Sequence, residues 1–119
     1  MRKDNNYYAT EFAEGLLEQQ KAIWDGCDRP TVKKQEKRWS RAVEKLIASN
    51  EGIAALAELL QHQSPKVAIT AAVYLLDTCE EMKAVELLRQ QAKRPEDDLY
   101  AYAAQQRLAE WESQKKQKQ

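Results

Sequence analysis

The side chains best suited to chemistry in this sequence are one histidine, His62, and two cysteines, Cys27 and Cys79. A catalytic histidine needs a nucleophile within reach and a third group that orients its ring. Cys79 is the nearest thiol along the chain, but it falls at the start of a different expected helix. We therefore expect His62 to cap the end of its own helix, where the helix dipole favours the positive imidazolium. We predict no catalytic residue and do not expect an enzyme.

A metal or cofactor site is not expected either. Zinc needs three or four cysteine, histidine or carboxylate ligands close together, and the two cysteines and one histidine are widely spread. The acidic groups Glu80-Glu81 and Glu96-Asp97-Asp98 fall at expected helix starts, where carboxylates ordinarily act as caps. With three glycines in the chain, no glycine-rich phosphate loop is present. Free thiols in a reducing cytoplasm are the expected state of both cysteines.

The clearest candidate surface is a basic stripe formed by Lys34, Arg38, Arg41 and Lys45, which follow one another at helical spacing. Residues 29–45 carry seven basic side chains against two acidic ones, a net charge of about +5. Such a stripe is either a solvated helix face or an electrostatic footprint for an acidic protein or a nucleic acid. The chain as a whole has zero formal charge and a pI of about 6.6, which disfavours a nucleic acid.

The composition predicts an all-α protein of one domain, residues 1–119. Ala, Leu, Glu, Lys, Gln and Arg dominate, whereas Gly and Pro occur three times each. Residues 1–9 contain no apolar stretch typical of a secretory signal, and no run of about 18 apolar residues suggests a membrane span. We expect a cytoplasmic protein that does not contact a membrane.

Proline positions and apolar period predict about six helices. They cover residues 6–24, then 30–49, a third from about Asn50 that carries Leu59 and Leu60, then 65–77, a fifth to about residue 93, and a sixth opened by Pro95. The expected caps are Asn50, Ser64 before Pro65, and Thr78 with Glu81. The expected buried stripes comprise Tyr8, Phe12, Leu16, Ile23 and Trp24 in the first helix, Val32, Trp39, Val43, Leu46 and Ile47 in the second, and Leu99, Ala101, Ala104, Leu108 and Trp111 in the sixth.

Short connections predict three antiparallel hairpins, an N-terminal cap over residues 5–49 and repeats over 50–78 and 79–112, followed by a disordered tail, 113–119. The repeat is visible as Leu59-Leu60 followed by Ala71-Ala72, and again as Leu87-Leu88 followed by Ala103-Ala104. A helical hairpin repeated at roughly 30 residues is typical of a HEAT-like α-solenoid. A compact helical bundle is the alternative.

The order of these signals resembles a family of small bacterial HEAT-like proteins catalogued as a domain of unknown function. The resemblance is carried by Glu11-Phe12, Ala54-Ala55-Leu56, Ser64-Pro65-Lys66-Val67, Ala71-Ala72, Lys83-Ala84-Val85 and Trp111. It departs from the family at Arg94-Pro95-Glu96-Asp97-Asp98, where the family tends to have glycine, and at Ala68, where it often has arginine. The resemblance implies a bacterial cytoplasmic protein and, by analogy, a binding or toxin-neutralising role.

In a solenoid the second, fourth and sixth helices line one inner face. The predicted partner-binding residues on that face are Lys34, Arg38, Arg41, Lys45, Lys66, Thr70, Tyr74, Asp98, Tyr102 and Gln105. Tyr74, Tyr100 and Tyr102 are either half-buried core or interface anchors, because interfaces favour tyrosine.

We expect a non-catalytic protein-interaction module of the immunity or antitoxin type, whose partner is another protein such as a toxin. The alternative is a nucleic-acid-binding helical-repeat protein that uses the basic second helix. An enzyme or small-ligand pocket near Trp24, Trp39 and Tyr74, and a homodimer, stay open.

Overall fold

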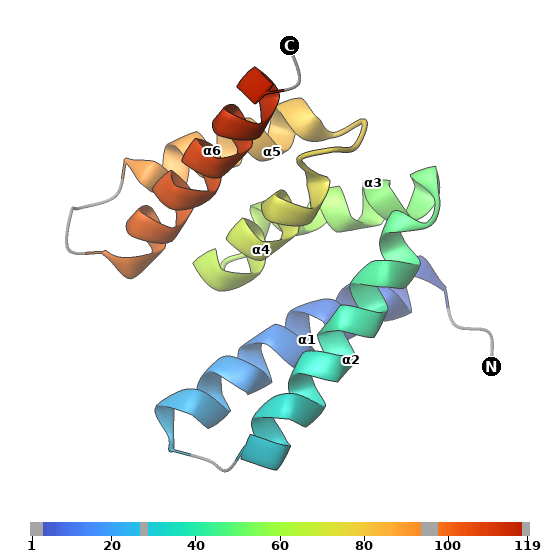
Figure 1. Cartoon of the computed structure of the whole chain (residues 1–119). Helices are drawn as coiled ribbons and strands as arrows, with labels where there is room; N and C mark the ends of the chain where they lie inside the picture. Colours follow the sequence, from blue (N-terminus) through green and yellow to red (C-terminus); the bar gives the residue numbers. More distant parts are fainter. Residues whose placement is uncertain (1–3, 27–28, 94–97, 118–119) are drawn as a thin grey trace. The chain divides into compact units, whose positions relative to one another are not determined.

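The computed structural model describes residues 4–26, 29–93 and 98–117. Within these ranges the chain forms six α-helices, one 3-10 turn and no strand, which confirms the predicted all-α class. None of these described helices is both long and apolar enough to cross a membrane. The elements, shown in Figure 1, are α1 (Asn5–Trp24), α2 (Arg29–Ile47), α3 (Asn50–Glu58), the 3-10 turn η1 (Leu59–Gln61), α4 (Pro65–Leu75), α5 (Glu81–Ala92) and α6 (Leu99–Gln117).

The chain divides into two compact units, Met1–Leu59 and Leu60–Gln119. The first contains α1, α2 and α3, and the second contains α4, α5 and α6. The predicted hairpin over residues 50–78 would join α3 to α4 across this division. The stack of three hairpins and the choice between solenoid and bundle therefore stay predictions.

In the first unit α1 and α2 lie side by side along their length (Figure 1). Gly15 permits this close approach, because a Cβ atom added there would lie 3.0 Å from the Cβ of Trp39. The third helix, α3, packs on the C-terminal end of α2, where the backbone of Gly52 meets that of Leu46. The buried apolar residues of this unit are Phe12, Ala13, Leu16, Ala22, Ala42, Val43, Leu46, Ile53 and Leu56.

Three residues that the helical period assigns to the core of this unit are exposed, so that part of the prediction is wrong. Ile23 is 56% exposed, Trp24 is 73% exposed and Ile47 is 40% exposed. Ile23 and Trp24 form the last turn of α1 at the tip of the hairpin, whereas α3 covers the opposite end. Ile47 is the last residue of α2. The period identifies the correct face, but within this unit no helix covers the tip of the hairpin, and α3 leaves Ile47 partly exposed.

In the second unit α5 packs against both α4 and α6, and α4 also contacts α6. Ala71, Ala72 and Ala104 are fully buried, as expected of small residues that let helices approach closely. Leu99 is 82% exposed, which corrects its assignment to the core of α6. The buried residues of this unit are Val67, Ala68, Ile69, Ala71, Ala72, Leu75, Leu76, Ala84, Val85, Leu88, Ala101 and Ala104.

The helix starts differ in detail from the predicted caps. Ser49 caps α3 in place of Asn50, since its hydroxyl accepts a hydrogen bond from the amide of Gly52 at 3.0 Å. Ser64 holds the predicted cap position before Pro65, but its side chain makes no capping hydrogen bond. Thr78 does not form the predicted capping box. Its hydroxyl donates to the carbonyl of Leu75 and accepts from the amide of Glu80, so it ends one turn and starts the next.

The predicted tail from residue 113 is helical as far as Gln117, because Glu81 of α5 holds the end of α6. One carboxylate oxygen of Glu81 accepts from the indole of Trp111 at 3.2 Å, and the other pairs with Lys115 at 3.3 Å. The Lys115 ammonium also lies 4.4 Å from the centre of the Trp111 ring. The predicted roles of residues 94–97, including Pro95, and of residues 118–119 fall outside the described residues.

Candidate functional site

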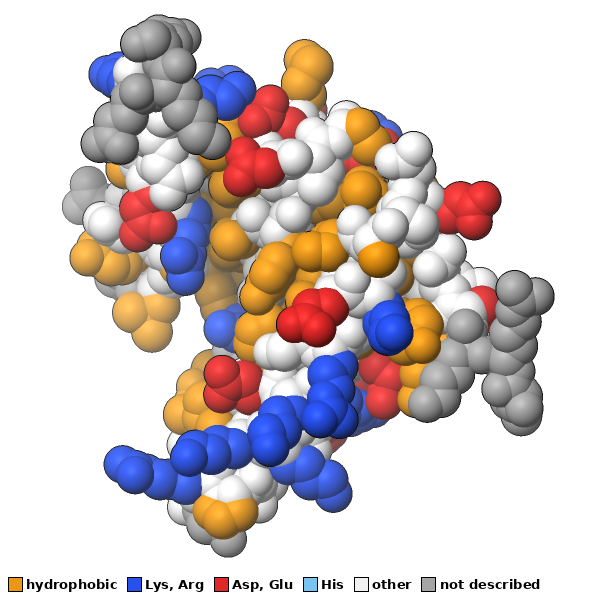
Figure 2. Space-filling view, turned by 45° about the vertical axis from the view of Figure 1, so that its right-hand side comes forward, with side chains coloured by type: hydrophobic (Ala, Val, Ile, Leu, Met, Phe, Trp, Pro, Cys, Tyr) orange, Lys and Arg blue, Asp and Glu red, His pale blue; other side chains and the backbone are white. Residues whose placement is uncertain are grey.

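A row of five basic side chains, which we call the basic ridge, runs the length of α2. Its members occur at every fourth position and are all exposed: Arg29, Lys33, Lys37, Arg41 and Lys45. At a rise of 1.5 Å per residue, successive members are about 6 Å apart along the helix and turn by roughly 40° at each step. Figure 2 shows a continuous band of Lys and Arg side chains that follows this helix, with acidic side chains next to it.

The basic ridge has no ionic partner within the described part of the chain. The ion pairs of that part all involve other cations, and none of the five ridge side chains makes a hydrogen bond within it. Like charges four residues apart destabilise a helix by a few tenths of a kcal/mol per pair at low salt. The four successive pairs therefore destabilise α2 by roughly 1–2 kcal/mol. Packing against α1 and α3 must offset this loss.

Arg38, a member of the predicted stripe, is not available for a partner in this arrangement. Its Nε and Nη2 atoms donate to one oxygen of Glu11 at 3.0 and 2.5 Å, and Nη2 also donates to Glu14 at 2.7 Å. The hydrogen bond to Glu11 is the largest effect on the pKa of Arg38, which is raised above its ordinary value, while partial burial acts in the opposite direction. Arg38 thus belongs to the α1–α2 interface, and the predicted stripe loses one of its four cations.

Aromatic packing beside Arg38 keeps the hairpin in register. The ring of Trp39 meets that of Phe12 edge to face, with centroids 6.1 Å apart. The Trp39 indole donates to the side-chain oxygen of Gln19 at 2.9 Å. Trp39 is half-buried, in agreement with the prediction that it lies off the basic stripe and joins the core. The basic ridge is therefore presented by a helix whose opposite face is well anchored.

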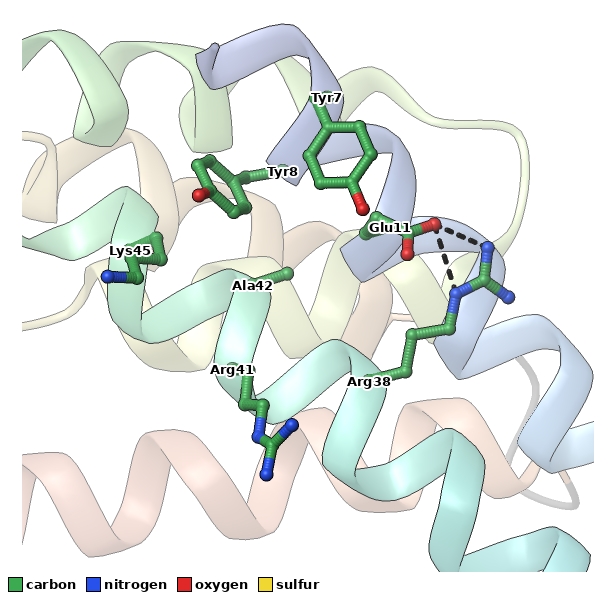
Figure 3. A pocket seen from close by; sticks show the side chains of 7 residues that line it. All are labelled: Tyr7, Tyr8, Glu11, Arg38, Arg41, Ala42 and Lys45. Atoms are coloured by element: carbon green, nitrogen blue, oxygen red, sulfur yellow. Dashed lines mark hydrogen bonds and ion pairs between the residues drawn. The ribbon is translucent and has the colours of Figure 1, made fainter. Parts of the chain in front are cut away.

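A hollow of about 360 Å³, which we call the tyrosine pocket, opens between the N-terminal part of α1 and the C-terminal part of α2. The rings of Tyr7 and Tyr8 meet edge to face with centroids 5.3 Å apart, and Tyr7 is 40% exposed. In Figure 3 these rings stand over α2, with Glu11 and Arg38 on one side and Lys45 on the other. The lining residues are Tyr7, Tyr8, Glu11, Arg38, Arg41, Ala42 and Lys45.

Arg41 is the residue that connects this pocket with the basic ridge. It lines the tyrosine pocket and also two hollows nearer the N-terminus of α2, one with Lys34 and Lys37 and one with Glu36 and Lys37. Figure 3 shows its guanidinium pointing away from the tyrosine rings, so its aliphatic stem borders the pocket and its charge faces outward. An arginine that borders three hollows and has no ionic partner among the described residues is well suited to binding an anion.

The remaining predicted site residues belong to the second unit, and several are already engaged there. Thr70 donates its hydroxyl to the carbonyl of Lys66 at 2.7 Å, and Gln105 donates its side-chain amide to the carbonyl of Ala92 at 3.0 Å. The Asp98 carboxylate accepts from the amides of residues 100 and 101 and so caps α6. The inner face predicted to combine these residues with the basic stripe spans both units and stays a prediction.

The tyrosines considered as core or interface differ from one another. Tyr102 is 61% exposed, Tyr74 is 36% exposed and Tyr100 is half-buried. Of the three, Tyr102 is the most exposed, and the choice between core and interface stays a prediction. The predicted ligand pocket near Trp24, Trp39 and Tyr74 draws on both units and stays a prediction; Trp24 itself is largely exposed.

His62 has a different role from the one predicted. Its Nδ1 atom accepts a hydrogen bond from the amide of Ser64 at 3.0 Å. His62 therefore shapes the turn that leads into α4. Cys79 is a free, exposed thiol, whereas Cys27 lies outside the described residues. The described residues contain no group of three or more potential metal ligands.

Neither a family model, nor a curated protein, nor a solved structure matches the chain. The resemblance to small HEAT-like proteins therefore stays a prediction, and the assignment of function depends on the geometry of the site.

Sequence reasoning missed much of that geometry. A test for strict four-residue spacing would have found Arg29, Lys33 and Lys37, because the spacing is fully visible in the sequence. The contributions of Tyr7, Tyr8 and Glu11 carry no such signal, since they depend on how α1 is placed along α2.

Proposed function

We propose that this chain is a non-catalytic binding module that docks an acidic segment of a partner protein on the basic ridge. The observation that carries the proposal is the exposed guanidinium of Arg41, which has no ionic partner among the described residues and borders three hollows. Arg38, one turn away, is held by two carboxylates of its own chain. Arginine and tyrosine are the residue types that contribute most to protein interfaces.

The pattern of charges beside the ridge favours a protein over a nucleic acid. Glu36 and Glu44 are exposed on α2 and fall within one turn of ridge residues, and Glu36 lines a hollow together with Lys33 and Lys37. A phosphate backbone along the ridge would approach these carboxylates, whereas a protein segment can place a lysine or arginine against them. Zero net charge over the whole chain also supports a protein partner.

The finer parts of the proposal follow the sequence resemblance. They are a HEAT-like stacking of hairpins, a bacterial cytoplasmic setting, and an immunity- or antitoxin-type role in which the module covers a toxin in a one-to-one complex. A nucleic-acid-binding module is the second candidate, because five cations with a regular step could also follow a phosphate backbone.

A paired charge-reversal experiment tests the proposal. The tagged chain, the variant Lys37→Glu/Arg41→Glu and the control Lys93→Glu/Lys116→Glu are purified from the native host. Both variants change the net charge by the same amount at exposed lysines or arginines. We expect one protein to accompany the wild type and the control in equal molar amount, and to be lost with the ridge variant. Equal recovery of the partner protein with both variants would show that the basic ridge is not needed for binding it.

Titration with duplex DNA and RNA separates the second candidate. Five phosphate contacts would weaken binding roughly 500-fold between 50 and 200 mM salt. The protein-binding proposal expects no saturable binding at 50 mM salt. Saturable, ridge-dependent binding with that steep salt response would replace the protein partner with a nucleic acid.

A further inference from the structure

The tyrosine pocket continues the basic ridge at its C-terminal end. Arg41 and Lys45 belong to both, and from them the pocket extends onto α1 through Tyr7 and Tyr8. A partner segment that runs along the ridge from Arg29 to Lys45 therefore meets the tyrosine pocket at its far end. The pocket differs from the rest of the ridge because it adds aromatic walls to the cations.

The chain contains its own example of a carboxylate bound at this interface. Glu11 of α1 places its carboxylate on Arg38 of α2 at one side of the pocket (Figure 3). One turn farther toward the N-terminus of α1, opposite Ala42 and Lys45, the helix presents Tyr7 and Tyr8 in place of an acidic residue. The interface thus gives Arg38 two carboxylates, those of Glu11 and Glu14, and leaves the next ridge cations, Arg41 and Lys45, without an ionic partner among the described residues.

The walls of the pocket suit a side chain that is apolar along its stem and charged at its tip. The tyrosine rings and the buried methyl group of Ala42 offer apolar surface. Lys45 supplies positive charge at the rim, and the aliphatic stem of Arg41 adds to the apolar surface. Glutamate and aspartate have this construction, whereas a phosphate group lacks the apolar stem.

We propose that the tyrosine pocket binds a glutamate or aspartate side chain of the partner protein, with its carboxylate on Lys45 and its stem against Tyr7 and Tyr8. The inference rests on the proposed function, because it names the group through which the acidic segment is anchored. The inference assigns the binding of this carboxylate to Lys45 and not to Lys33, although both are exposed lysines of the same ridge. Lys45 lines the pocket, and Lys33 lies at the far end of α2.

NMR titration tests the proposal with two short probes that differ by one group, acetyl-Leu-Glu-amide and acetyl-Leu-Gln-amide. At low salt we expect saturable shifts at the amides of Tyr7, Tyr8 and Lys45 with the glutamate probe, and at least fivefold weaker binding of the glutamine probe. Equal affinity of the two probes, or shifts spread evenly along α2, would overturn the assignment.

The matched variants Lys45→Met and Lys33→Met remove the same charge at the two ends of the ridge. We expect Lys45→Met to weaken the glutamate probe at least fivefold and to abolish the preference over glutamine, while Lys33→Met changes the affinity by less than twofold. Tyr7→Ala should weaken binding without a change of charge. Equal losses in both lysine variants would show general attraction along the ridge and contradict a pocket.

Two further arms identify the source of a failure. Inorganic phosphate that displaces the glutamate probe at the same or a lower concentration would overturn the assignment to a carboxylate. If the probe fails at the pocket while Lys37→Glu/Arg41→Glu still loses the partner protein, the pocket inference is wrong and the ridge proposal stands. If neither the probe nor a partner protein binds, both are wrong.

Discussion

Arg38 of α2 uses two nitrogen atoms to bind a single carboxylate oxygen of Glu11, and so connects two helices whose interacting residues are 27 positions apart. Both side chains are about one quarter exposed, so water screens the pair only in part. Glu14 adds a second carboxylate to the same guanidinium. This cluster fixes α1 along α2, and with it the position of the tyrosine pocket.

Removing the charge of Arg38 should destabilise the protein. We expect Arg38→Met to lower the free energy of unfolding by about 1–2 kcal/mol, because Glu11 is left half-buried without its donor. Urea unfolding of Arg38→Met, Glu11→Gln and the double variant measures the coupling, which should be about 1 kcal/mol. Strictly additive effects of the two substitutions would show that the pair contributes nothing.

The two glycines of the first unit should differ in their tolerance of alanine. A Cβ atom on Gly52 would lie 2.1 Å from the carbonyl oxygen of Leu46, which is backbone and cannot move aside. We expect Gly52→Ala to cost at least 2 kcal/mol, roughly the upper part of the range for overpacking. At Gly15 the nearest atom is 3.0 Å away, and alanine gains helix propensity, so Gly15→Ala should cost about 1 kcal/mol or less. The reverse order in thermal unfolding would be inconsistent with these contacts.

Ser49 and Ser64 hold equivalent positions before two helices but should respond differently to substitution. The Ser49 hydroxyl caps the amide of Gly52, so Ser49→Ala should cost about 1 kcal/mol. The Ser64 side chain makes no capping hydrogen bond, so Ser64→Ala should change stability by less than about 0.5 kcal/mol. Chemical denaturation of both variants under one set of conditions is the check, and equal costs would contradict it.

The carboxylate of Glu81 should control the end of α6. With Glu81→Gln, Lys115 loses its ionic partner and the hydrogen bond from Trp111 weakens, so the amides of the last two turns should exchange with solvent several-fold faster. Glu86→Gln, at an exposed position of the same helix, is the control and should leave that exchange unchanged. Equal exchange rates in the two variants would mean that Glu81 does not hold α6.

Neutralising the middle of the basic ridge should stabilise the free protein. Lys37 has a cation four residues away on each side, so Lys37→Gln removes two repulsive pairs. We expect a gain of roughly 0.5 kcal/mol at 20 mM salt that disappears at 500 mM salt, where charges are screened. A loss of stability at low salt would indicate that Lys37 has a favourable partner in the chain. A gain would mean that the ridge is retained at some cost to folding, as binding surfaces often are.

The sequence was sufficient to predict the helices, because their signals are local. Apolar period, Pro65 and the turn around Gly26 are properties of a few neighbouring residues, and they place most helix ends within a few positions. The exposure of Trp24 could not be predicted in the same way. Its spacing assigns it to the buried face of α1, but burial also requires a neighbouring element at the tip of the hairpin, and the period of one helix contains no information about that.

The candidate site was predictable only in part, for a related reason. Arg41 and Lys45 follow from spacing on one helix. The pairing of Arg38 with Glu11 depends on the offset between two helices, to which the close fit of Gly15 against Trp39 also contributes. The same offset places Tyr7 and Tyr8 over α2. A shift of α1 along α2 by one helical turn would be compatible with the same sequence pattern but would create a different pocket.

The exposed indole of Trp24 supplies an optical reporter at the end of the hairpin where the ridge begins, five positions before Arg29. Trp39 and Trp111 are both half-buried against neighbouring side chains, so Trp24 should contribute the most red-shifted part of the protein's fluorescence. A bound segment that spans the whole of α2 would shield this indole and shift its emission to the blue. A segment confined to the tyrosine pocket would leave the emission unchanged. The emission wavelength of Trp24 therefore reports how far along α2 a ligand extends.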